Sequence, residues 1–140
     1  ITQRDIDLAR ALHIINKNYN IDSATFKKSF EADGFVVMIV DKGDVGKVIG
    51  KRGKFIRILR RKLNKNIRVV GETENLKEFV GELIYPARIT GIDIVYPVSE
   101  DTVSRIRIEK ESLDKMPAEK TKIERVLNEI RKEEIKIVFE

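Results

Sequence analysis

Cysteine and tryptophan are absent from this chain of 140 residues, and histidine occurs once, as His13. Without cysteine there is no disulfide framework and no thiolate metal site, and one histidine is too few for a zinc cluster. The longest clean apolar run is FVVMIV at 35–40, far shorter than the roughly 18 residues that a membrane span needs. The first ten residues contain no signal-peptide core. We therefore predict a cytoplasmic protein with no metal, no cofactor and no membrane partner.

Positive charge is concentrated in the first half of the chain. Residues 1–71 carry 16 basic and 7 acidic side chains, a net charge of +9, whereas residues 72–140 carry 12 basic and 16 acidic ones, a net charge of −4. The stretch from Val45 to Gly71 includes no acid at all. Scattered charge usually only keeps a surface solvated, but an acid-free run of this length predicts a polyanionic partner for the first half.

The spacing of apolar residues predicts the same order of elements twice. In the first half, an N-terminal helix precedes strands at TFKKSF and FVVMIV, a short helix or turn at KGDVGKVI, an amphipathic helix after Gly53 and a strand at IRVV. In the second half, a helix at ENLKEFVGELIYPA precedes strands at GIDIVY and SRIRIE, an amphipathic helix at KTKIERVLNEIRKEE and a strand at IKIVF. This repetition predicts an α+β fold made of two similar units.

The two amphipathic helices support an internal duplication, because one constant offset along the chain superimposes their apolar stripes. One extra residue is then needed before the last strand. We predict two domains, at 1–71 and 72–140, with almost no linker between them. The stripe pairs are Ile56 with Ile123, Leu59 with Val126, and Leu63 with Ile130.

The stretch Gly50-Lys51-Arg52-Gly53 has the properties of a phosphate-binding loop. Glycine has no Cβ, so another backbone can approach it closely. The helix predicted to begin at about Lys54 presents unpaired N–H groups and the positive end of its dipole to this loop. Arg57 and Arg61, one and two turns further on, extend the positive charge along the helix.

The loop does not fit a P-loop, because Gly46-Lys47 is followed by Val48 and Asp41 stands where the leading glycine belongs. A glycine turn between two helices, with basic residues serving only solubility, is the structural alternative. The acid-free stretch and the duplicated order of elements favour binding.

The stretch VIGKRGKFIRILRRKL resembles the signature of a KH domain, whose GXXG loop clamps the backbone of a four-nucleotide single strand. The order helix-strand-strand-helix-helix-strand is that of the type II KH fold, with a three-stranded sheet. Two such domains in tandem, joined by a stretch such as ELIYPARITGIDIV, are similar to the NusA family, especially its short archaeal NusA-like members.

The resemblance implies a non-enzymatic RNA-binding factor in transcription elongation or termination. Its partners would be nascent single-stranded RNA and RNA polymerase. An apolar groove floor would be formed by Val48, Ile49 and Ile56, although these positions are equally explained as core. The implied RNA-binding residues are Lys47, Val48, Ile49, Gly50, Lys51, Arg52, Gly53, Lys54, Arg57 and Arg61.

The second domain departs from this pattern. The offset that pairs the two helices lays the GKRG loop on Pro117-Ala118-Glu119-Lys120. Proline lacks an N–H group, and the side chain of Glu119 repels phosphate. We therefore expect domain 2, at 72–140, to carry a degenerate PAEK loop that does not clamp RNA, while nearby lysines leave a peripheral contact open.

Two alternative functions remain open. A ribosome-associated KH protein would use the same loop, although the tandem duplication speaks against it. An enzyme that seats a nucleotide phosphate would need acids near the loop, and Asp41 and Asp44 are the only ones close by.

Overall fold

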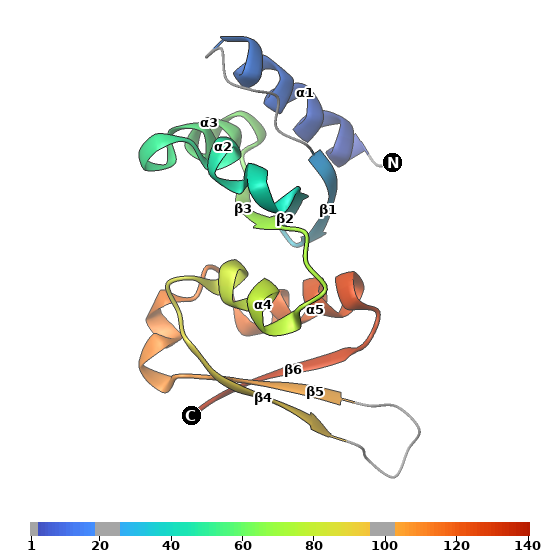
Figure 1. Cartoon of the computed structure of the whole chain (residues 1–140), viewed down its shortest axis with the longest axis vertical. Coiled ribbons are helices and arrows are strands. Elements are labelled where there is room, and N and C mark those ends of the chain that lie inside the picture. The colour runs from blue at the N-terminus through green and yellow to red at the C-terminus, as the bar shows by residue number, and fades with distance from the viewer. Residues whose placement is uncertain (1–2, 19–25, 96–102) are drawn as a thin grey trace. The chain divides into compact units, whose positions relative to one another are not determined.

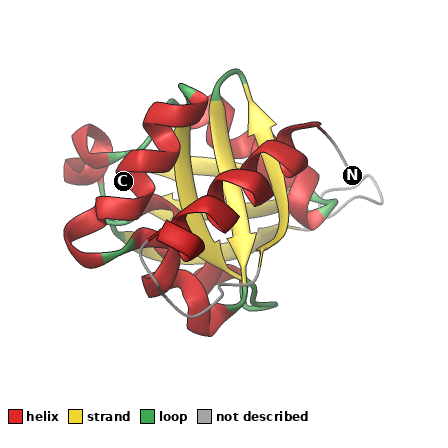
Figure 2. Cartoon of the chain, turned by 90° about the horizontal axis from the view of Figure 1, so that it is seen from above, coloured by secondary structure: helices red, strands yellow, loops and turns green. Residues whose placement is uncertain are grey.

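The computed structural model describes residues 3–18, 26–95 and 103–140. The chain divides into two compact units, Ile1–Thr73 and Glu74–Glu140. Each unit has a three-stranded sheet, with strand order β1-β2-β3 in the first and β4-β5-β6 in the second. Figure 2 shows the strands in yellow and the helices in red. The predicted α+β class with two similar units is therefore confirmed.

The first unit places its helices on one face of its sheet (Figure 1). Its strand β2 is buried along its whole length, as the run FVVMIV predicted. The β1–β2 turn is formed by Asp33 and Gly34, both with positive φ. The elements are α1 (Gln3–Asn18), β1 (Phe26–Ala32), β2 (Phe35–Val40), the 3-10 helix η1 (Lys42–Asp44), α2 (Val45–Ile49), the 3-10 helix η2 (Lys51–Gly53), α3 (Lys54–Leu63) and β3 (Asn66–Gly71).

The core of the first unit joins α1 and α3 to the sheet. Leu8 and Leu12 of α1 pack in one cluster with Val36 and Met38 of β2 and with Leu59 of α3. Burying such side chains contributes roughly 1.5–3 kcal/mol each. This cluster fixes the position of α3, and with it the loop that precedes the helix.

The second unit repeats the order of strands and of long helices, and it differs in the segment between its second strand and the helix that follows. A 3-10 helix takes the place that α2 has in the first unit, and it ends before Met116, which is extended because Pro117 follows. The elements are α4 (Leu76–Ile84), β4 (Ile89–Val95), β5 (Val103–Ile108), the 3-10 helix η3 (Lys110–Lys115), α5 (Lys120–Arg131) and β6 (Glu134–Phe139).

The parallel strand pairs of the two units have the same register. Pairing runs from Phe35 with Asn66 to Val40 with Gly71 in the first unit, and from Val103 with Glu134 to Ile108 with Phe139 in the second. The extra residue expected before the last strand is taken up within the longer helix, since α5 has 12 residues against 10 in α3. The internal duplication is thus a property of the backbone as well as of the sequence.

Candidate nucleic-acid interface

The GKRG loop connects α2 to α3 through a backbone that is largely left-handed. Gly50 has φ 79°, Arg52 has φ 56° and Gly53 has φ 73°. The loop is closed by two backbone hydrogen bonds, in which the Gly50 N–H donates to Gly46 O at 2.9 Å and the Gly53 N–H donates to Gly50 O at 3.1 Å. Lys51 and Arg52 are the first two residues of η2, and the first N–H groups of a helix have no acceptor within it. Two donors are thus left available in the middle of the loop.

The two glycines of the loop serve different purposes. A Cβ atom on Gly50 would overlap Cδ2 of the Phe55 ring, so Gly50 is required by packing inside the protein. A Cβ atom on Gly53 would come no closer than 3.6 Å to a neighbouring atom, the Arg57 guanidinium nitrogen Nη1. A side chain at Gly53 would therefore meet only ordinary contacts, and the demand for glycine there comes from its left-handed backbone.

The basic side chains predicted to bind are all exposed, namely Lys47, Lys51, Arg52, Lys54, Arg57 and Arg61. Lys47 lies 3.6 Å from the Asp44 carboxylate, and Arg57 donates a hydrogen bond to the carbonyl oxygen of Arg52 at 2.6 Å. Within the described part of the chain, the side chains of Lys51 and Arg61 have no ion-pair or hydrogen-bond partner. These two cations are free to meet a phosphate.

The apolar residues predicted to face the bases differ in exposure. Val48 is fully buried, at 0% exposure, and belongs to the core cluster. Ile56 is also buried, whereas Ile49 is half-buried and packs against that cluster. The expectation that Val48 contacts a base does not fit its position, because its side chain is buried in the core. The same sequence pattern is equally typical of a core residue. Ile49 is the one of the three with surface to offer.

Two of the cations in the acid-free stretch, Arg60 and Lys65, have structural roles that the sequence pattern did not reveal. The Arg60 guanidinium donates to Ile67 O at 3.0 Å, and burial lowers the pKa of both Arg60 and Arg68. The Lys65 ammonium donates to the Glu31 carboxylate at 2.8 Å. These contacts join α3 to β3, and the turn between them to β1, so part of the positive charge is committed to folding.

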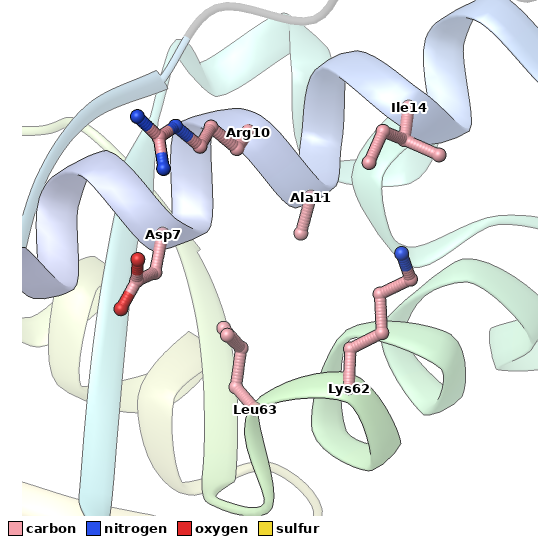
Figure 3. Close-up of a pocket in the computed structure, with 6 residues that line it drawn as sticks. All are labelled: Asp7, Arg10, Ala11, Ile14, Lys62 and Leu63. Carbon is pink, nitrogen blue, oxygen red and sulfur yellow. The ribbon is translucent and has the colours of Figure 1, made fainter.

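A shallow hollow of about 270 Å³ lies between α1 and α3 (Figure 3). Its apolar side chains are those of Ala11, Ile14 and Leu63, and charged groups of both signs surround them. The sequence contains no motif that indicates this hollow, and its mixed lining does not define a ligand. The charged residues that line it are Asp7, Arg10 and Lys62.

The equivalent surface of the second unit lacks these features. No residue of the PAEK stretch has a positive φ, and Glu119 directly precedes α5. In the alignment of the two helices, Lys54 is replaced by Thr121, Arg57 by Glu124 and Arg61 by Asn128. The side chain of Asn128 instead accepts a hydrogen bond from the Ile135 N–H at 2.7 Å.

The described residues contain neither a candidate metal site nor a candidate membrane-spanning helix. Among them there is no group of three or more His, Cys, Asp or Glu side chains that could hold a metal ion. None of the helices in this part of the chain is long and apolar enough to cross a membrane.

The KH domain family matches residues 35–82, which run from β2 through the GKRG loop and α3 into α4. A KH domain is thus detected over a stretch that includes the GKRG loop, whose motif predicted it.

A curated relative from Methanocaldococcus jannaschii is named probable transcription termination protein NusA, and it is 27% identical over 113 residues. This match covers 77% of the present chain and 61% of the relative, so the chain spans less than two thirds of that protein. The crystal structure of APE1850 has a TM-score of 0.71 over 100% of both chains, at 20% sequence identity, which shows a shared fold.

Proposed function

For this NusA-like KH protein, we propose a role as an RNA-binding transcription factor that holds single-stranded RNA at the GKRG loop of its first unit. The KH domain match and the NusA-named relative support an RNA-binding protein connected with transcription. The finer role that we propose is transcription elongation or termination, in the cytoplasm, with nascent RNA and RNA polymerase as partners. No catalytic step is part of the proposal.

One observation carries the proposal above the others. The loop offers the N–H groups of Lys51 and Arg52, which begin η2, and it is flanked by exposed cations and by Gly53, which has no side chain. Backbone N–H groups in such a turn form a concavity for an anion, and the positive end of α3 adds to its field. A phosphodiester is an anion that can approach along Gly53 while its neighbours in the strand reach Arg61.

The division of labour between the units is also part of the proposal. We assign 1–71 as KH domain 1 and 72–140 as KH domain 2, whose PAEK loop does not clamp RNA. This assignment is supported by a comparison of the two units. Their strand registers coincide, but Glu119 and Glu124 stand where the first unit has Arg52 and Arg57.

The test is binding of a labelled single-stranded RNA of mixed sequence, measured across a range of salt concentrations. The logarithm of affinity should fall with the logarithm of salt by about 0.7 for each phosphate neutralised. Gly53→Asp places a carboxylate in the loop and should weaken binding by about a hundredfold or more.

Gly53→Asn is the matched control, because asparagine tolerates a left-handed backbone and has almost the same shape as aspartate without its charge. It should lose much less affinity than Gly53→Asp. Unchanged affinity in Gly53→Asp would remove the loop from the RNA site. Co-purification with ribosomes rather than with RNA polymerase would favour the ribosome-associated alternative.

A further inference from the structure

The side chain of Arg57 leaves α3 and returns to the loop that precedes the helix. Its Nη1 atom donates to the carbonyl oxygen of Arg52 at 2.6 Å. Side chains on a helix are directed toward its N-terminus, so a residue in the first turn of α3 is well placed for this contact. The bond is charge-assisted, which makes it one of the stronger hydrogen bonds available to an exposed loop.

The residue that receives this bond has an unusual backbone. Arg52 has φ 56° and ψ 29°, a left-handed conformation that residues other than glycine rarely adopt. It is followed by Gly53, which is also left-handed. Arg52 lies inside η2, and its carbonyl oxygen accepts the hydrogen bond from the Arg57 guanidinium, a contact that offsets part of the strain there.

Orientation of the Arg52 carbonyl matters for the anion site. A peptide group is planar, so turning the carbonyl of Arg52 also turns the N–H of Gly53, and it changes the direction in which the whole loop faces. A free carbonyl oxygen near the loop would present partial negative charge to a phosphate. The bond to Arg57 occupies that oxygen and keeps it directed toward the helix.

We infer that Arg57 is a positioning residue, which locks the left-handed turn at Arg52 so that the loop is already in its binding shape before RNA arrives. This inference rests on the proposed RNA-binding function. It differs from the sequence expectation, in which Arg57 follows the phosphate backbone. Arg61, which has a free side chain, keeps that second role.

Salt dependence separates the two roles. Arg57→Ala should weaken RNA binding by about tenfold while leaving the salt slope unchanged. Arg61→Ala should lower the slope by about 0.7, the amount expected when one phosphate contact to a single strand is lost. A fall of the same size in the slope of Arg57→Ala would overturn the inference.

A sharper test measures the effect of Arg57→Ala in two variants of Arg52, one with glycine and one with alanine at that position. Glycine adopts the left-handed conformation without strain, whereas alanine does not. Arg52→Gly and Arg52→Ala both remove the charge of Arg52. Adding Arg57→Ala should cost about tenfold in affinity in the Arg52→Ala background and less than about twofold in the Arg52→Gly background. Equal costs in the two backgrounds would show that Arg57 acts through its charge.

The RNA-free protein provides an independent readout. In Arg57→Ala, the backbone order parameters of the loop amides should fall from about 0.85 toward about 0.6, while those of β2 stay unchanged. Unchanged loop order parameters would overturn the positioning role. If the wild-type protein binds no RNA, the proposed function fails, and the order parameters still decide what Arg57 does to the loop.

Discussion

The two loops that precede α3 and α5 stand on matching scaffolds and have opposite chemistry. In the first unit, Gly50 to Gly53 form a left-handed turn with two available N–H groups and exposed cations. In the second, Pro117 to Lys120 lead into α5 without a left-handed residue, and Glu119 lies at the helix start. Because the strand registers are the same, the fold does not require a GKRG sequence at this place. Apart from Gly50, which makes room for Phe55, the motif is better explained by what it binds.

The largest effect is expected from giving α3 the side chains of α5. Three simultaneous changes remove three cations and add one acid on the exposed face of the helix. RNA affinity should fall by at least about a hundredfold, because affinity for a polyanion depends on the phosphates neutralised. Fluorescence anisotropy with a labelled single strand measures the loss. The changes are Lys54→Thr, Arg57→Glu and Arg61→Asn.

A matched control removes the same number of cations from the second unit, where Lys115, Lys120 and Lys122 flank the PAEK loop. Replacing all three by alanine should change affinity by less than about threefold, since the loop between them lacks the left-handed turn of the first unit. Comparable losses in both triple variants would mean that RNA does not distinguish the two units.

A smaller effect separates the two glycines of the first loop. Gly50→Ala forces a Cβ atom against the Phe55 ring in addition to straining the backbone, and it should destabilise the first unit by about 2 kcal/mol or more. Gly53→Ala introduces only the backbone strain, about 1 kcal/mol. Hydrogen exchange of the β2 amides reports both values.

Phe55→Ala provides the check on this difference, because it removes the ring that the new Cβ atom meets. In the Phe55→Ala background, Gly50→Ala and Gly53→Ala should cost similar amounts. If Gly50→Ala still destabilised this background much more than Gly53→Ala, a contact other than the Phe55 ring would explain why glycine is needed at position 50.

The smallest effect concerns the acid stability of the first unit. The hydrogen bond from Lys65, followed by its charge, the Gly34 N–H and the charge of Arg4, holds the pKa of Glu31 below its ordinary value of 4.5 against the opposing effect of burial. A carboxylate whose pKa is lowered by folding contributes stability above its ordinary pKa, and this contribution is lost as the pH falls through the lowered value.

Glu31→Gln should therefore destabilise the first unit by about 1 kcal/mol or less at pH 7, and the difference from wild type should vanish in acid. Urea unfolding followed by NMR separates the units. The second unit has Glu133 where the first has Lys65, so no such contribution is expected from that position. A difference between the variant and wild type that persists at low pH would contradict this account.

Sequence reasoning predicted most of the architecture because the relevant signals are local and periodic. The buried strand FVVMIV, the turn at Asp33-Gly34 and the stripe of Ile56 and Leu59 can each be recognised within a few residues. The internal repeat supplied that evidence a second time. The replacement of α2 by a 3-10 helix in the second unit was not predicted, although Pro117 was the available signal.

The candidate site was predicted less completely. The sequence marked ten basic residues between Gly46 and Val70, but it could not divide them by role. Lys65 pairs with Glu31, which is distant in the chain, and Arg60 donates to the backbone of β3. Such contacts depend on how distant elements meet, and side-chain periodicity contains no information about that.

By itself, the sequence determined the α+β class, the duplication, the exposed basic face of α3 and the contrast between GKRG and PAEK. These features depend on helical and strand periodicity and on glycine positions, which can be recognised within short stretches of the chain. Only the tertiary structure decided that Gly50 makes room for Phe55, that Val48 belongs to the core, and that Arg57 holds the carbonyl of Arg52. These outcomes depend on distances of a few ångströms between side chains and backbone, which exist only once the elements are packed together.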